Sequence, residues 1–119
     1  MTIPRTFFGR SEIQRVLFRN TDLSESTLCW NDFVDIDFTA CTLENSDMRA
    51  ATFKATRFTG ADLCSTDLRH STFEGCDFSQ ADLRGAKLTR VGGAKLKLSQ
   101  SQTESIAWQD DEGDEPGGG

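Results

Sequence analysis

Residues 51–90 read ATFKATRFTGADLCSTDLRHSTFEGCDFSQADLRGAKLTR, and a large apolar residue stands at every fifth position of this stretch. The same spacing continues outward without a gap. The central positions are Phe8, Ile13, Phe18, Leu23, Leu28, Phe33, Phe38, Leu43, Met48, Phe53, Phe58, Leu63, Leu68, Phe73, Phe78, Leu83 and Leu88. A period of five matches neither the helix period of 3.6 nor the strand period of 2. It predicts short straight segments separated by regular corners.

A small or compact residue usually stands two positions before each centre. These residues include Ser26, Cys41, Ser46, Ala51, Ala61, Ser71, Cys76, Ala81 and Ala86. Side chains two apart on an extended segment point the same way, so we expect both to face inward. The other three positions of each repeat are predicted to face water or to form the corner.

A second period sets the number of sides. From position 13 onward the centres repeat as Phe-Phe-Leu-Leu, with Ile13 in place of one Phe and Met48 in place of one Leu, so the pattern closes every twenty residues. One predicted column holds Phe18, Phe38, Phe58 and Phe78, and another holds Leu23, Leu43, Leu63 and Leu83. Like residues stack on like residues, as a solenoid with four segments per turn requires.

These repeats resemble a known family. The segments ADLCS at 61–65 and ADLRG at 81–85 look like the A-(D/N)-L-x-x repeat of bacterial pentapeptide-repeat proteins, as do SDMRA at 46–50 and STFEG at 71–75. The resemblance covers residues 6 to about 90. It implies an all-β fold, a right-handed quadrilateral β-helix of about four coils.

The chain is predicted to have three parts. Residues 1–98 form the β-solenoid, 99–109 a short C-terminal capping helix, and 110–119 a disordered acidic, glycine-containing tail. Two overlapping capping-box patterns begin at Ser99 and Ser101, and they predict a helix from about residue 100 to residue 109. Ile106 and Trp108 would then cover the last coil.

Charge and hydropathy exclude several protein classes. The 119 residues carry a net charge of -6. Five uncompensated acidic residues lie between 110 and 115, so the solenoid itself is nearly neutral and direct nucleic-acid binding is not expected. No apolar run reaches the roughly 20 residues of a membrane span, and no signal-peptide pattern begins the chain. We expect a cytoplasmic protein with no membrane contact.

The residues that usually carry chemistry are sparse. The cysteines Cys29, Cys41, Cys64 and Cys76 form no C-x-x-C pair, and His70 is the single histidine. We therefore expect free thiols in a reducing compartment and neither metal nor cofactor. No nucleophile, phosphate-loop or zinc-protease motif is present in the sequence, so an enzyme is not expected.

The clearest candidate site is an acidic strip on one predicted side. It comprises Asp22, Glu25, Glu44, Asp62 and Asp82, opposed only by Arg84. The next side carries Arg49, Arg69, Lys87 and Arg90 against Asp47 and Asp67. Two interpretations stay open, a solvated surface and an electrostatic docking face. Trp30, at a corner, and Val34, at an outward position, form a second candidate interface.

We expect a non-enzymatic protein–protein interaction module with another protein as its partner. Some members of the resembled family confer quinolone resistance by imitating duplex DNA to type II topoisomerases, and the acidic strip would suit that role. The near-neutral solenoid, the short tower and the lack of a long insertion loop count against it. A third alternative is an immunity protein to a toxin. Phe7 and Leu17, at outward positions of the first coil, could also pair with a second copy as a homodimer.

Overall fold

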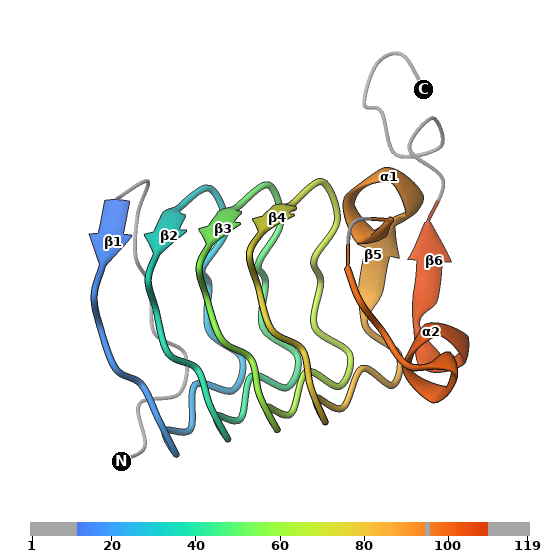
Figure 1. The fold of residues 1–119 in the computed structure, drawn as a ribbon, viewed down its shortest axis with the longest axis horizontal. Coiled ribbons are helices and arrows are strands. Elements are labelled where there is room, and N and C mark those ends of the chain that lie inside the picture. Colours follow the sequence, from blue (N-terminus) through green and yellow to red (C-terminus); the bar gives the residue numbers. More distant parts are fainter. Residues whose placement is uncertain (1–11, 95, 110–119) are drawn as a thin grey trace.

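The computed structural model describes residues 12–94 and 96–109, and these form a stack of coils capped at the C-terminal end (Figure 1). One side of the stack is a parallel sheet in the order β1-β2-β3-β4. Its strands are β1 Glu12–Gln14, β2 Asp32–Val34, β3 Thr52–Lys54 and β4 Thr72–Glu74. Each residue pairs with the residue twenty positions later, for example Phe53 with Phe73. The predicted turn of twenty residues is therefore confirmed.

The other three sides keep the same offset through isolated β-bridges, such as Asp37 with Arg57 and Asp47 with Asp67. We name the sides in chain order. Side A holds β1 to β4, side B holds residues 16–20 and their equivalents, side C holds 21–25, and side D holds 26–30. Four segments per turn make a quadrilateral, in which side A lies opposite side C.

The predicted inward positions form the core. Phe58 is fully buried and stacks on Phe38 at 5.2 Å and on Phe78 at 4.7 Å between ring centroids. It also meets Phe53 edge-on at 5.3 Å. Ala61, two positions before Leu63, is likewise fully buried. Phe18 is half-buried in the first described coil, and Phe8 lies outside the described residues.

Each corner turns through the left-handed backbone region. Residues with positive φ recur every five positions, among them Asn20, Trp30, Ser65 and Gly85. Glycine is favoured in this region, and most other residues adopt it only at some cost. The repeated corner geometry therefore fixes which residues point outward, and it places Trp30 at an edge of the solenoid.

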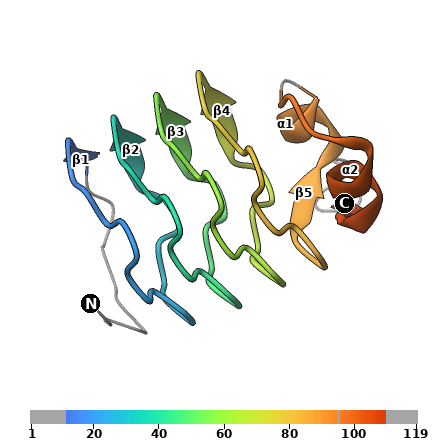
Figure 2. The same cartoon turned by 60° about the horizontal axis from the view of Figure 1, so that its bottom comes forward.

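The C-terminal cap differs from the prediction. The helix α2 spans Gln100–Ser105 and does not reach residue 109, because Ala107–Gln109 forms a strand, β6, that pairs in parallel with β5 at Lys87–Thr89. A second short helix, α1 at Arg90–Gly93, was not predicted. Figure 2 shows α1 and α2 together beside β5 at the end of the stack. The predicted tail, 110–119, lies outside the described residues.

The start of α2 confirms the first capping box. The Ser99 side chain accepts a hydrogen bond from the Gln102 N–H, and the Gln102 side chain accepts one from the Ser99 N–H. The amide of Gln102 also donates to the carbonyls of Phe78 and Ala81, at 2.8 and 2.9 Å. Ile106 is buried and Trp108 packs on the core, so both cover the last coil as predicted.

Within the described ranges, no helix has the length and apolar character required to span a bilayer.

Candidate functional site

The predicted acidic residues gather on side C. Asp22, Thr42, Asp62 and Asp82 form one continuous column of parallel bridges across successive coils. Glu44 lies two positions after this column, and Glu25 lies at a corner with a φ of 58°. The twenty-residue period therefore brings all five predicted carboxylates to one side of the solenoid.

The aspartates of the column are also part of the turn structure. The Oδ1 atom of Asp22 accepts the N–H of Ser24 at 2.9 Å, Asp62 accepts that of Cys64 at 3.0 Å, and Asp82 accepts that of Arg84 at 3.2 Å. Carboxylates of this kind compete well for backbone donors in turns. The frequent aspartate before the centre thus has a structural cause, because it binds the N–H that precedes the corner.

Arg84 neutralises one end of the acidic column. Its Nε and Nη2 atoms donate to Asp82 at 2.9 and 2.6 Å. These bonds are the main cause that lowers the pKa of Asp82 to about 2. The same Asp-x-Arg pairing joins Asp47 to Arg49 and Asp67 to Arg69 on side D. The recurring D-x-R triplet at 47–49, 67–69 and 82–84 is the sequence signal for this pairing.

Cys64 lies close to two of the predicted site residues, Asp62 and Asp82. The sequence alone did not identify Cys64 as part of this site. Burial, followed by the carboxylates of Asp62 and Asp82, raises the pKa of the Cys64 thiol to about 12, so the thiol stays protonated near neutral pH. One ligand atom from each of these three residues lies within 4.8 Å of the others. A tetrahedral zinc site needs four ligands, and the Arg84 guanidinium, 3.9 Å from Cys64 Sγ, already supplies positive charge here.

The second predicted interface lies away from side C. Trp30 is 58% exposed at the corner between sides D and A. Val34 is half-buried on β2, between Gln14 and Lys54 in the strand register. Side A lies opposite side C, so the structure does not bring these two residues together with the acidic column. Leu17, on side B, is 73% exposed, whereas Phe7 lies outside the described residues.

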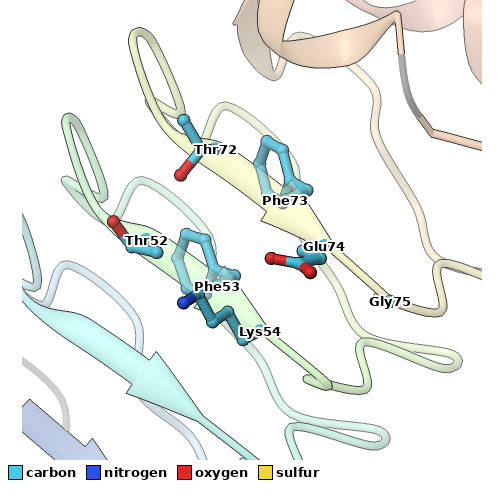
Figure 3. A pocket seen from close by; sticks show the side chains of 7 residues that line it. All are labelled: Thr52, Phe53, Lys54, Thr72, Phe73, Glu74 and Gly75. Atoms are coloured by element: carbon cyan, nitrogen blue, oxygen red, sulfur yellow. The ribbon is translucent and has the colours of Figure 1, made fainter.

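A shallow hollow on side A lies between β3 and β4. Figure 3 shows Phe53 and Phe73 in matching orientation one coil apart, with Lys54 and Glu74 following them on the two strands. Lys54 and Glu74 are partners in the strand register. The lining offers one cation and one carboxylate, together with the hydroxyls of Thr52 and Thr72. These hydroxyls and charged groups can each form a hydrogen bond with a polar group.

The lowered aspartate pKa values predict how stability depends on pH. Hydrogen bonds from Arg84 and Ser24 lower the pKa values of Asp82 and Asp22 below their ordinary value of 3.8. A group with a lowered folded-state pKa contributes stability above its unfolded-state pKa and loses that contribution as the pH falls. We therefore expect the Tm to be level from neutrality to about pH 5 and to fall between about pH 4 and pH 2.

Thermal melts followed by circular dichroism across this range would test the expectation. The variant Asp82→Asn should show a smaller fall, because it removes a carboxylate whose pKa is lowered to about 2. A wild-type Tm that stays constant down to pH 2 would contradict the role given to these aspartates.

Comparisons with known proteins agree with this architecture. A family model for pentapeptide repeats, in 8 copies, matches residues 32–69 and 65–91. The comparison with curated proteins gave no match. Among solved structures, the pentapeptide repeat protein Rfr23 from the cyanobacterium Cyanothece 51142 has a TM-score of 0.55 and 16% identity, over 73% of this chain and 56% of Rfr23.

A trypsin-treated variant of QnrB1, described as a plasmid-mediated fluoroquinolone resistance protein, has a TM-score of 0.61 and 21% identity, over 74% of this chain and 50% of that structure. This chain thus spans less than two thirds of the length of both structures, and identities this low show a shared fold. The family match covers residues 32–91, about half of the chain, and the coils observed there have the matched five-residue repeat. The chain therefore belongs to the pentapeptide-repeat family.

Proposed function

We propose that this chain is a non-enzymatic protein-binding module that docks side C against a basic surface of a partner protein. One observation carries the proposal, namely that five carboxylates lie on one side of a rigid solenoid against a single guanidinium, that of Arg84. Such a concentration of one sign of charge steers a partner of the opposite sign and fixes its orientation.

The carboxylates of side C are held in place before a partner arrives. Asp22, Asp62 and Asp82 are each fixed by a hydrogen bond to a backbone N–H, and successive coils lie about 4.8 Å apart. Their side chains lose little conformational freedom on binding, which reduces the entropy cost of association. The lowered pKa values of Asp22 and Asp82 keep both groups ionised at neutral pH.

A second candidate function is mimicry of DNA toward a type II topoisomerase. The regular column of carboxylates favours it, because duplex DNA also presents negative charges at short, even intervals. Thr42 and Arg84 interrupt the charge of this column in the second and fourth coils. If the chain neutralises a toxin, that toxin would be a partner protein with a basic surface, bound by side C as in the first candidate function.

Neutralising side C tests the proposal. The variant Asp22→Asn, Glu44→Gln, Asp62→Asn removes three charges while each Asn keeps the oxygen that accepts the turn N–H. Its matched control, Asp32→Asn, Asp35→Asn, Glu74→Gln, removes three charges from side A. Quantitative mass spectrometry of proteins captured from host lysate at about 0.15 M salt should show basic partners kept by the control and depleted at least about ten-fold by the side C variant.

Equal capture of partners by the two variants would show that side C does not bind them. Trp30 and Val34 would then be the next candidate binding residues. A supercoiling assay with purified topoisomerase separates the two candidates. Salt-sensitive inhibition by the wild type, lost in the side C variant, would favour DNA mimicry, whereas capture without inhibition would leave the general binding module.

A further inference from the structure

The last described residues of the chain, 107–109, lie on side D. Strand β6 adds one more layer to this side, with Ala107 beside Lys87 and Gln109 beside Thr89. The next six residues, 110–115, carry five carboxylates and no cation. These are Asp110, Asp111, Glu112, Asp114 and Glu115. A strongly acidic segment therefore starts at the outer edge of side D.

Side D has the opposite charge. Among residues 12–90 it is the one side on which cations outnumber acids, with Arg49, Arg69, Lys87 and Arg90 against Asp47 and Asp67. Asp47 and Asp67 are bonded to Arg49 and Arg69, and the layer of residues 86–90 holds two cations, Lys87 and Arg90, and no carboxylate. Lys87 is exposed and makes no ion pair within the described ranges.

We propose that the acidic segment 110–115 docks on side D of its own molecule, against Lys87 and Arg90. Gln109, the last residue before the segment, pairs with Thr89, which directly precedes Arg90 in the chain. The segment is tethered a few residues from its site, so its effective concentration there is on the order of millimolar. Side C repels the segment, and each contact on side D is an exposed ion pair that weakens with salt.

The docked segment changes what the molecule presents to a partner. It neutralises the last layer of side D, so the full chain presents side C as its dominant charged surface. An anionic ligand for side D must displace the segment first. This inference does not depend on the function proposed for side C, because it concerns a different side and an occupant within the chain.

Carbodiimide cross-linking tests the docking in the full chain, because it joins a lysine amine to a carboxylate only when the two are in contact. Lys54, an exposed lysine on side A, is the matched control. Mass spectrometry should find the acidic segment joined to Lys87 at least about five times more often than to Lys54 at about 0.01 M salt, and the preference should disappear at about 1 M.

An equal mixture of ¹⁴N and ¹⁵N protein separates docking within one molecule from pairing of two. Cross-links to Lys87 within single-isotope species support the proposal, whereas mixed-isotope cross-links would overturn it in favour of a second copy. Cross-links mainly to Lys54 or Lys97, or none to any lysine, would also overturn it.

Amide chemical shifts give a second measurement that does not use lysine chemistry. Replacing the five acids of 110–115 by Asn and Gln should shift the amides of Arg69, Lys87, Thr89 and Arg90 and leave those of side B unchanged. Absence of any shift on side D would overturn the proposal even if cross-links were found.

Discussion

Phe58→Ala is expected to lower the free energy of unfolding by about 3–5 kcal/mol, the usual cost of truncating a buried phenylalanine. The Phe58 ring has no solvent exposure and contacts Phe38, Phe78 and Phe53, with centroid distances of 4.7 to 5.3 Å. Removing it leaves a cavity in the middle of the stack, where neighbouring coils cannot close in because their spacing is fixed by backbone hydrogen bonds.

Urea denaturation and thermal melts would measure the effect, with an expected fall in Tm of roughly 10 °C or more. Thr59→Ala and Lys54→Ala are matched controls, because both side chains point outward and should change stability by less than about 0.5 kcal/mol. Equal losses of stability in all three variants would show that the assignment of inward-facing and outward-facing positions is wrong. A loss that spreads only to adjacent coils, seen by hydrogen exchange, would agree with the nearest-neighbour coupling of solenoids.

The solenoid could be predicted because its signal is repeated many times. Each inward column contains several copies of the same environment, so one exception such as Met48 does not obscure the pattern. The cap has no such redundancy. A capping box at Ser99 favoured a helix, but the N–H of Ala107 donates to the carbonyl of Ala86 at 2.7 Å and so starts a strand.

The sequence nevertheless contained the signal for this strand. Trp108 lies twenty residues after Leu88 and continues the column of Leu28, Met48, Leu68 and Leu88, while Ile106 lies twenty residues after Ala86. Extending the twenty-residue period beyond the break at Gly93 would have identified residues 106–109 as another layer of side D. The capping boxes predict a helix up to residue 109, and for residues 106–109 this prediction is wrong, because α2 ends at Ser105 and β6 follows.

The positions of the side C carboxylates followed from the same period, but their bonding did not. Whether Asp82 faces water or turns toward Arg84 depends on side-chain rotamers and on the backbone N–H at the corner. The position of Cys64 between Asp62 and Asp82 likewise depends on two coils meeting at one place. Such contacts depend on how side chains pack between coils, and the repeat pattern of the sequence does not contain this information.

The cap offers the second large effect, because Gly93→Ala should destabilise the protein by about 1–3 kcal/mol, the usual cost of overpacking a filled site. Gly93 is buried, and a Cβ atom there would lie 2.4 and 2.6 Å from the Cζ3 and Cη2 atoms of Trp108. The ring cannot move freely, because its Nε1 donates to the Thr103 carbonyl at 3.0 Å and its backbone belongs to β6. The added methyl group must therefore loosen the cap from the last coil.

A Trp30→Phe background leaves Trp108 as the single tryptophan, so its fluorescence reports the cap directly. In this background Gly93→Ala should shift the Trp108 emission to longer wavelength and lower the urea midpoint, whereas Val91→Ala, on the same helix but 69% exposed, should change neither. Adding Trp108→Val should recover part of the loss caused by Gly93→Ala, because the smaller side chain leaves room for the methyl group. A double-mutant cycle measures this coupling, with urea unfolding followed by circular dichroism because no tryptophan remains in these variants. Unchanged emission and an unchanged midpoint in Gly93→Ala would show that Trp108 does not hold the cap on the last coil.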